Sequence, residues 1–433
     1  MTRPASNSSK ISPARWAAYE VLLRVETKRE FTSTLLPEYE EKLRPVDRGL
    51  CHELVLGTLR RQIYLDRVID ELTGGKRLDI EVRVILRMGI FQLAFLERIP
   101  AHAAVNDAVA LTNRVKKSSA RGLVNAVLRK ASQGLPELAF ADDLERVSVE
   151  TSHPRWLIER WAEQFGADTS AAIAAANNQT PTLAFRRTYK GRDIDLSGYE
   201  LSKIVEGCYI AESFDANLRR MADVGDIYFQ DEASQLVANA VQLGAGKSFL
   251  DVCAAPGGKT TAIVGIAQQD LSVAGDITER RVRLLRETCV KQGLGGIKIV
   301  QYDAAYSLPF ADLTFEVVFV DAPCTGTGTI RHNPEIRYFV EPADIERMHE
   351  LQLAIITNAA KLVKPGGRLI YSTCSLEPEE NEHVAEAFLA AHPRFHATPC
   401  AVPERFLTAE GHARTRPDRD QTDGFFIASF TAE

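Results

Sequence analysis

Apolar residues follow two different patterns along the chain. From residue 12 to 133 they recur at helical spacing, as in ARWAAYEVLLRV and VRVILRMGIFQLAFL, with Pro and Gly between the runs. From about residue 240 onward, short apolar runs alternate with helical stretches. We therefore expect a helical bundle in the first part of the chain. In the last part we expect an α/β fold, with a mostly parallel sheet covered by helices on both faces.

Seven apolar runs are predicted to form the strands of this sheet, at 248–252, 272–276, 297–302, 315–320, 368–373, about 395–400 and 424–430. Helical patterns lie between most of them, at 260–269, 279–292, 342–363 and 379–391. The sequence KPGG at 364–367 is predicted to end one of these helices with glycine.

The middle of the chain joins these two parts. Residues 134–142 read as a linker, SHPRWLIERWAEQFG from 152 as a helix with Pro154 in its first turn, and TPTLAFRRT as a strand carrying Arg186 and Arg187. For the two tryptophans of this helix, Trp156 and Trp161, packing in the core is favoured over stacking on RNA. We predict three domains, at 1–135, 143–240 and 241–433.

One stretch, SFLDVCAAPGGKTT at 248–261, combines a buried strand, a glycine-rich turn and a helix start. Open α/β sheets hold nucleotide-like ligands at such a turn. A phosphate-binding loop is excluded, because its first glycine would fall at Cys253, and no GxGxxG pattern is present. The next three predicted strands end at or next to Asp276, Asp303 and Asp321. Acids there disfavour a pyrophosphate and suit a ligand with a ribose and a positive charge, such as S-adenosylmethionine.

Charge is unevenly distributed along the 433 residues. The net charge is −6, but residues 1–135 alone carry +8 and the remainder carries −14. A basic first third on an acidic body is typical of a nucleic-acid-binding domain, although solvated helix faces explain the same numbers. No signal peptide and no run of about 18 apolar residues is found, so neither secretion nor a membrane span is expected. The polar first ten residues are expected to form a disordered tail.

Seven cysteines occur with no CxxC pair and no regular spacing, which argues against a disulfide framework or structural zinc and indicates a reducing cytosol. Cys324 and Cys374 each follow an apolar strand, near the three acids. A thiolate at such a strand end can attack a carbon atom. The other cysteines assigned to the core are Cys51, Cys208, Cys289 and Cys400.

Three motifs together, DVCAAPGGKT, DAPCTGTGTIR at 321–331 and YSTCS at 371–375, resemble the RNA cytosine-C5 methyltransferases of the RsmB/NOP2/NSUN family. The bacterial RsmB (Sun/Fmu) type is the most similar, and the resemblance covers nearly the whole chain. ARGLVNAVLRK at 120–130 resembles the last helix of a NusB-like RNA-binding domain. The resemblance implies a helical NusB-like bundle, a small α/β RNA-binding module and a Rossmann-like, S-adenosylmethionine-dependent methyltransferase sheet.

The resemblance also implies catalytic roles. Cys374, in the Thr-Cys-Ser motif, would attack carbon 6 of a cytosine, and Cys324 would assist release of the product. DNA cytosine methyltransferases attack with the Cys of a Pro-Cys pair instead, which here is Cys324. Asp321 would bind the cytosine edge, and Lys259 would reach the base or the cofactor carboxylate. Thr325 stands where the family usually has Ser.

The cofactor site is implied in the same way, and no metal is expected. The turn from Cys253 to Lys259 would surround the methionine end of S-adenosylmethionine. Asp276 would bind the ribose, Asp303 would lie near the adenine, and Asp321 would be shared with the substrate. Asp251 is expected to anchor the turn, with a direct contact to the cofactor as the alternative. The predicted cofactor-binding residues are Cys253, Ala254, Ala255, Pro256, Gly257, Gly258, Lys259, Asp276, Asp303 and Asp321.

The implied partner is 16S ribosomal RNA, free or in early assembly, methylated in the cytoplasm by a monomer. Two alternatives remain open: the same chemistry on a transfer RNA, and a catalytically inactive NusB-like RNA-binding assembly factor. The cations expected to contact RNA are Lys116, Lys117, Arg121, Arg129, Lys130, Arg60 and Arg61 in the first domain, and Arg331, His332 and Arg337 after the second motif.

Overall fold

The computed structural model describes residues 11–266 and 270–433. The expected N-terminal tail and the end of the helix expected at 260–269 lie outside these residues. The chain forms two compact units, of which the first comprises residues up to Asn178 with Asn333–Phe339, and the second comprises Gln179–His332 with Val340–Glu433. Among the described helices, none has both the length and the apolar character needed to cross a membrane.

The first unit is entirely helical, as the 3.6-residue pattern predicts. Its core is built from fully buried aliphatic residues such as Leu54, Ile85 and Leu128. Its helices are α1 (Pro13–Lys28), α2 (Thr32–Glu41), α3 (Pro45–Arg60), α4 (Gln62–Thr73), α5 (Ile80–Phe95), α6 (Ala101–Arg114), η1 (Ser118–Ala120), α7 (Arg121–Ala131), α8 (Asp143–Thr151), α9 (Arg155–Phe165), α10 (Ala167–Ala176) and the short α15 (Ile336–Phe339).

A small antiparallel sheet opens the second unit. Its strands pair in the order β2-β3-β1-β4, with β1 at Leu183–Arg187, β2 at Glu200–Leu201, β3 at Cys208–Ala211 and β4 at Ile227–Phe229, and α11 (Ala216–Val224) precedes β4. The helices α8–α10 group with the first unit, where α8 packs on α4. The segment predicted as one domain at 143–240 is therefore divided between the two units, and the predicted domain boundaries stay predictions.

The main sheet has the strand order β10-β12-β9-β8-β5-β6-β7. Strands β5 to β9 run parallel to one another, whereas β12 is antiparallel to β9 and to β10. The strands are β5 (Ser248–Asp251), β6 (Leu271–Asp276), β7 (Lys298–Gln301), β8 (Phe315–Asp321), β9 (Val363–Thr373), β10 (Phe395–Thr398), β11 (Ala413–Arg414) and β12 (Phe426–Ala432). The helices are α12 (Glu232–Ala240), α13 (Gly258–Val264), α14 (Glu279–Lys291), α16 (Pro342–Ala360), α17 (Glu382–Ala391) and α18 (Pro417–Asp420), with 3-10 turns at Thr327–Thr329, Pro378–Glu380 and Glu404–Phe406.

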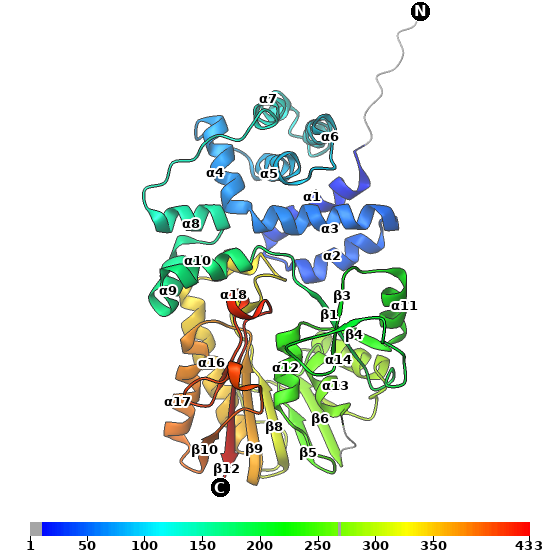
Figure 1. The fold of residues 1–433 in the computed structure, drawn as a ribbon, viewed down its shortest axis with the longest axis vertical. Coiled ribbons are helices and arrows are strands. Elements are labelled where there is room, and N and C mark those ends of the chain that lie inside the picture. Colours follow the sequence, from blue (N-terminus) through cyan, green and yellow to red (C-terminus); the bar gives the residue numbers. More distant parts are fainter. Residues whose placement is uncertain (1–10, 267–269) are drawn as a thin grey trace, which may run out of the picture. The chain divides into compact units, whose positions relative to one another are not determined.

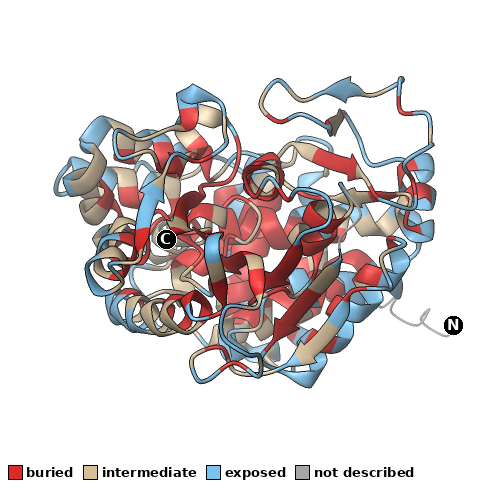
Figure 2. Cartoon of the chain, turned by 90° about the horizontal axis from the view of Figure 1, so that it is seen from below, coloured by how far each residue is buried: buried red, intermediate tan, exposed pale blue. Residues whose placement is uncertain are grey.

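Helices cover both faces of this sheet, with α16 and α17 on one side and α12, α13 and α14 on the other (Figure 1). Successive strand residues point to opposite faces, so Leu250 packs toward α16 and α17 while its neighbour Phe249 packs toward the other layer. Figure 2 shows that the strands at the centre of the sheet are buried. The predicted α/β fold with a parallel-rich sheet is confirmed.

One predicted boundary is wrong. The helix expected to run to residue 363 ends at Ala360, and KPGG lies within β9 instead of ending that helix. Gly366 has a φ of +71°, and the pairing of β8 with β9 shifts register beside it. The glycines therefore form an irregularity in a strand, a use of glycine that the sequence alone does not separate from a helix end.

Candidate active site

The two candidate nucleophiles meet at the carboxyl end of adjacent strands. Cys324 follows β8 by three residues and Cys374 follows β9 directly, and their Sγ atoms lie 3.2 Å apart. Parallel neighbours deliver their C-terminal loops to one edge of a sheet, which is where open α/β folds place ligands. The structure thus brings together two thiols that lie 50 residues apart in the chain.

The glycine-rich turn lies at the same edge, after β5. Gly257 has a φ of +105°, a conformation that side chains strongly disfavour, and α13 begins at Gly258. A Cβ at Gly258 would lie 2.8 Å from the Tyr228 ring, so glycine is needed there for packing as well. Behind the turn, Asp251 accepts a hydrogen bond of 2.6 Å from Thr260, as expected of an anchor. Burial raises the pKa of Asp251 to about 7.

Lys259 and Asp321 form an ion pair beside the thiols, with 2.8 Å between Nζ and Oδ2. The other carboxylate oxygen of Asp321 accepts a hydrogen bond of 2.9 Å from Ser372. The Lys259 ammonium also lies 4.6 Å from the centre of the Phe425 ring. Burial lowers the pKa of Lys259, but the charge and hydrogen bond of Asp321 outweigh burial and leave the pKa raised. Lys259 therefore stays charged, and its charge acts on both thiols.

The Cys324 thiol keeps its proton. Its hydrogen bond to Cys374 and its burial together raise the pKa of Cys324 well above the usual range. A thiol that holds its proton 3.2 Å from another sulfur can donate a hydrogen bond to a thiolate at that position. The geometry therefore suits a pair in which one sulfur attacks and leaves while the other donates.

Glu380 connects the two cysteine-bearing loops. Its buried carboxylate accepts hydrogen bonds from the Thr325 backbone N–H (2.8 Å) and from the Ser375 hydroxyl (2.9 Å). Thr325 directly follows Cys324 in the chain, and Ser375 directly follows Cys374. The Thr325 hydroxyl and the Gln352 amide also donate to it, the latter at 3.0 Å. One carboxylate thus fixes both loops, a relationship that spacing along the chain does not reveal.

A cavity of about 160 Å³ opens beside the turn and the ion pair. The residues that line it come from β4, the start of α12, the glycine-rich turn and β8: Tyr228, Phe229, Gln230, Ser234, Asp251, Cys253, Ala254, Ala255, Pro256, Gly258, Lys259 and Asp321. Most of the residues predicted for the cofactor turn therefore line one cavity. Sequence reasoning did not assign Tyr228, Phe229, Gln230 and Ser234 to the site.

Asp276 and Asp303 lie at the same sheet edge but not among the residues that line this cavity. Asp276 is 4% exposed, and its carboxylate accepts hydrogen bonds from the backbone N–H groups of Ala255 (2.9 Å) and Ile277 (2.8 Å). Arg281 closes over it, with Nε 2.5 Å from Oδ1. Asp303 accepts a hydrogen bond of 3.0 Å from the Ala305 N–H. The ribose and adenine roles of these two acids stay predictions.

Two of the three residues expected to meet the RNA backbone after the second motif are buried. Arg337 is 1% exposed and donates to the carbonyls of Thr151 and Ser152 and to the Asn178 side chain, so it fixes the first unit internally. Arg331 is 3% exposed. The expectation of RNA contact is wrong for both. A cation in a polar stretch of sequence indicates an exposed loop, but here the loop packs against the rest of the protein and buries both side chains.

His332, the third of these residues, pairs with Asp423 at 2.9 Å. Asp231 completes a group whose possible metal-ligand atoms lie within 4.8 Å of one another. These acids already have partners: Thr422 and the Ala233 N–H donate to Asp231 at 2.6 and 2.8 Å. The cluster therefore fixes the start of α12 against the segment before β12.

Among the other predicted RNA-contacting cations, Arg60 is buried and the Arg61 guanidinium lies 5.0 Å from the centre of the Phe95 ring. Arg186, which β1 carries, is also buried and donates to Gly258 O and Gln230 Oε1. Lys117 pairs with Asp79 at 2.8 Å. Four remain exposed on or beside α7, and their RNA contact stays a prediction: Lys116, Arg121, Arg129 and Lys130. The core assignments of Trp161 and of the four cysteines are confirmed, because all are buried.

Comparison with known proteins gives a consistent picture. Residues 238–431 match the family model described as 16S rRNA methyltransferase RsmB/F, residues 12–133 match the NusB family, and residues 153–187 match the RsmF/B-like ferredoxin-like domain. Probable ribosomal RNA small subunit methyltransferase B of Bacillus subtilis (strain 168) is 32% identical over 97% of this chain and 99% of that protein. Ribosomal RNA small subunit methyltransferase B of Pseudomonas syringae pv. tomato is 36% identical over 87% of this chain and 86% of that protein.

Solved structures show the same architecture. The crystal structure of PH0851 is similar over 97% of this chain and 99% of that one, with a TM-score of 0.82 and 26% identity. NSun6 from Pyrococcus horikoshii, solved with SFG, covers 64% of this chain and 98% of its own, with a TM-score of 0.55 and 20% identity, and shows a likeness of fold alone.

Proposed function

The chain belongs to the ribosomal RNA small subunit methyltransferase B family, and on this premise we propose that it methylates carbon 5 of a cytosine in 16S ribosomal RNA. We further propose that the reaction passes through a covalent bond between Cys374 and the cytosine. The observation that carries the proposal is the pair of thiols 3.2 Å apart beside the Lys259–Asp321 ion pair. An RNA methyltransferase acting on a ribose or on an exocyclic nitrogen needs no cysteine pair.

The residues at the sheet edge fit S-adenosylmethionine. The cavity beside the glycine-rich turn is lined by the Asp321 carboxylate, which repels phosphates and attracts a sulfonium charge, and by the carboxyl group of Asp251, whose pKa burial raises to about 7. One Asp251 oxygen, Oδ1, is buried without a hydrogen-bond partner, so the cavity wall has an acceptor to spare. When bound, S-adenosylmethionine supplies the methyl group that the activated base takes up. For Asp276 to reach a ribose hydroxyl, the half-exposed Arg281 must release it.

Cytosine carbon 5 is a weak nucleophile until carbon 6 is saturated. The Cys374 thiolate forms a bond to carbon 6, and the ring becomes an enamine. Asp321 lies three residues before Cys324 and offers a carboxylate to the protonated ring nitrogen, where charge changes during attack. Lys259, held 2.8 Å from Asp321, fixes that carboxylate and keeps a positive charge beside the ring.

Release reverses the first bond. Solvent accepts the carbon 5 proton, and the electrons of that bond re-form the double bond between carbon 5 and carbon 6 while the bond between carbon 6 and sulfur breaks and its electron pair returns to Cys374. Cys324 holds its own proton and, at 3.2 Å, donates a hydrogen bond to the departing thiolate. The raised pKa of Cys324 is consistent with a role in release, and the choice of Cys374 as the attacking group follows the resemblance of its Thr-Cys-Ser motif.

Bisulfite sequencing of ribosomal and transfer RNA, from the source strain with and without this protein, tests the proposal. We expect one cytosine mark in 16S ribosomal RNA to disappear with the protein and to return with the intact gene. Loss of a mark in transfer RNA alone would assign the substrate to the alternative. An unchanged map of both RNAs would contradict the proposed chemistry.

A further inference from the structure

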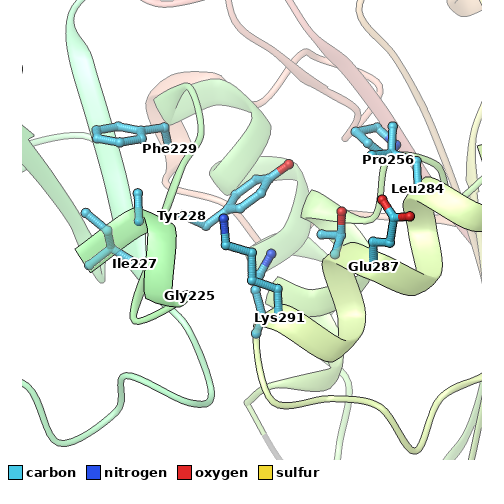
Figure 3. A pocket seen from close by; sticks show the side chains of 11 residues that line it. Gly225, Ile227, Tyr228, Phe229, Pro256, Leu284, Glu287 and Lys291 are labelled. Carbon is cyan, nitrogen blue, oxygen red and sulfur yellow. The ribbon is translucent and has the colours of Figure 1, made fainter. Parts of the chain in front are cut away.

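A second cavity, of about 490 Å³, lies next to the candidate active site. One side is formed by the end of α11 and by β4, including Gly225, Ile227 and Phe229, and the other by Leu284, Thr288 and Lys291 of α14. Figure 3 shows the Tyr228 ring between these two sides, with Pro256 and Leu284 at one end. We call this cavity the α11–α14 groove. The reaction proposed above assigns no role to it.

The groove adjoins the catalytic cavity. Tyr228, Phe229 and Pro256 line both of them, so one wall separates the two spaces. Pro256 belongs to the glycine-rich turn, and the Tyr228 ring packs on Gly258 in the same turn. The groove therefore lies where an RNA strand bound at the catalytic cavity would place a nucleotide next to the reacting base.

The side of the groove formed by β4 is apolar and aromatic up to the surface. Phe229 contacts the Phe214 ring, with 5.4 Å between centroids, and Phe214 is 50% exposed. The Arg219 guanidinium lies over Phe214 at 5.2 Å. On the opposite side, Leu284 is 47% exposed. Exposed rings capped by arginine are the surfaces on which proteins stack unpaired bases.

A cation lies on each side of the groove. Arg219 of α11 covers the Phe214 ring beside it, and Lys291 of α14 lines the groove itself, together with Glu287. Cations next to apolar and aromatic surface complement a polyanion with flat apolar bases, and they do not complement a purely hydrophobic partner.

We propose that the α11–α14 groove binds an unpaired nucleotide of the substrate RNA close to the target cytosine, with its base against the apolar lining at Leu284 and its phosphate near Lys291, and that Phe214, which contacts the lining residue Phe229, extends this stacking surface outward. The inference rests on the proposed function and adds to it the substrate class: RNA that is single-stranded around the reacting base. Stacking accepts any base, so this contact positions the strand without reading its sequence.

Four single substitutions on one exposed helix surface test this proposal. Leu284→Ala and Lys291→Ala alter the groove, whereas Val290→Ala and Arg286→Ala remove a similar aliphatic group and a similar charge from exposed positions of α14 outside it. Each full-length variant would be titrated against an unstructured RNA of about ten nucleotides carrying 2-aminopurine. Anisotropy gives the Kd, and quenching of 2-aminopurine reports stacking.

We expect Leu284→Ala to raise the Kd severalfold and to reduce quenching, and Lys291→Ala to lower the slope of log Kd against log salt by about 0.7. Phe214→Ala, in the exposed loop before α11, should raise the Kd about tenfold. The Val290 and Arg286 variants should behave as the parent protein does.

Equal Kd, salt slope and quenching in the groove variants and their controls would overturn the inference, and the proposed function would stand if the parent protein still methylated unmodified 16S ribosomal RNA. A parent protein that bound RNA through the groove but transferred no methyl group would contradict the proposed function and leave the groove contact intact. A parent protein that bound no RNA would overturn both.

Discussion

The sulfur atoms of Cys324 and Cys374 lie 3.2 Å apart, and a single buried carboxylate, Glu380, holds the loops that carry them. The thiols belong to the chain segments that follow β8 and β9, and these segments are joined directly by hydrogen bonds from the Gly328 N–H to the Cys374 carbonyl and from the Leu376 N–H to the Thr327 hydroxyl, each 3.0 Å long. Glu380 adds a further link through Thr325 and Ser375. The reactive geometry therefore depends on a residue that touches neither substrate nor cofactor in the proposed reaction.

Replacing Glu380 tests this dependence. Glu380→Gln keeps the size of the side chain but replaces one of the two acceptor oxygens by an NH₂ group. The donors that now share two oxygens then have one, so at least one donor loses its partner. We expect methyl transfer to fall at least about tenfold, which corresponds to about 1.4 kcal/mol of lost positioning, with unchanged S-adenosylmethionine affinity. Calorimetry with the cofactor and a tritium-transfer assay measure the two quantities. Equal losses of cofactor binding and of transfer would indicate general disruption instead.

The cofactor assignment predicts opposite behaviour for Asp276 and Arg281. Asp276→Ala removes the acceptor of the Ala255 and Ile277 N–H groups and should weaken S-adenosylmethionine binding by about 1.5 to 3 kcal/mol. Arg281→Ala frees the same carboxylate and should leave binding equal or tighter. Titration calorimetry on both variants provides the comparison. Undiminished binding by Asp276→Ala would remove the ribose role from that residue.

Burial of Asp251 makes stability depend on pH. Its pKa rises from 3.8 to about 7 on folding, so the folded protein holds a proton that the unfolded chain releases. The stabilising effect of this retained proton is complete at pH values below 3.8, and the free energy of unfolding falls as the pH rises toward about 7. Asp251→Asn keeps an acceptor for Thr260 and should flatten this decline. Thermal unfolding across that pH range measures it, and identical slopes for both proteins would contradict the assignment.

The exposed cations of α7 are expected to contribute to RNA binding. Replacing Arg121, Arg129 and Lys130 together by Ala should lower the slope of log Kd against log salt by about 0.7 to 0.9 for each phosphate contact that is lost. A comparison variant with Ala at Arg44, Arg146 and Arg155 removes three exposed cations of the same unit that already pair with carboxylates. Filter binding of 16S ribosomal RNA at several salt concentrations distinguishes them. Equal slopes would make the first unit a scaffold.

The sequence was sufficient to predict the residues that a parallel sheet brings together. Asp321, Cys324 and Cys374 each follow an apolar run, and the ends of parallel strands share an edge, so their proximity follows from strand order. Glu380 and Ser372 could not be identified in this way, because their roles depend on side chains that meet across loops. The assignment of Arg337 to the RNA surface is wrong. A cation in a polar stretch indicates exposure, but the segment that carries Arg337 packs with the helical unit and leaves its side chain 1% exposed.

The roles of the two thiols are separated by a denaturing gel of both cysteine variants with RNA and S-adenosylmethionine, and 5-methylcytosine is assayed alongside. If Cys374 attacks and Cys324 favours release, Cys374→Ala forms no RNA-linked band and transfers no methyl group. Cys324→Ala still methylates but retains the RNA as a band that survives denaturation. An RNA-linked band for Cys374→Ala and none for Cys324→Ala would contradict the assignment and make Cys324 the nucleophile.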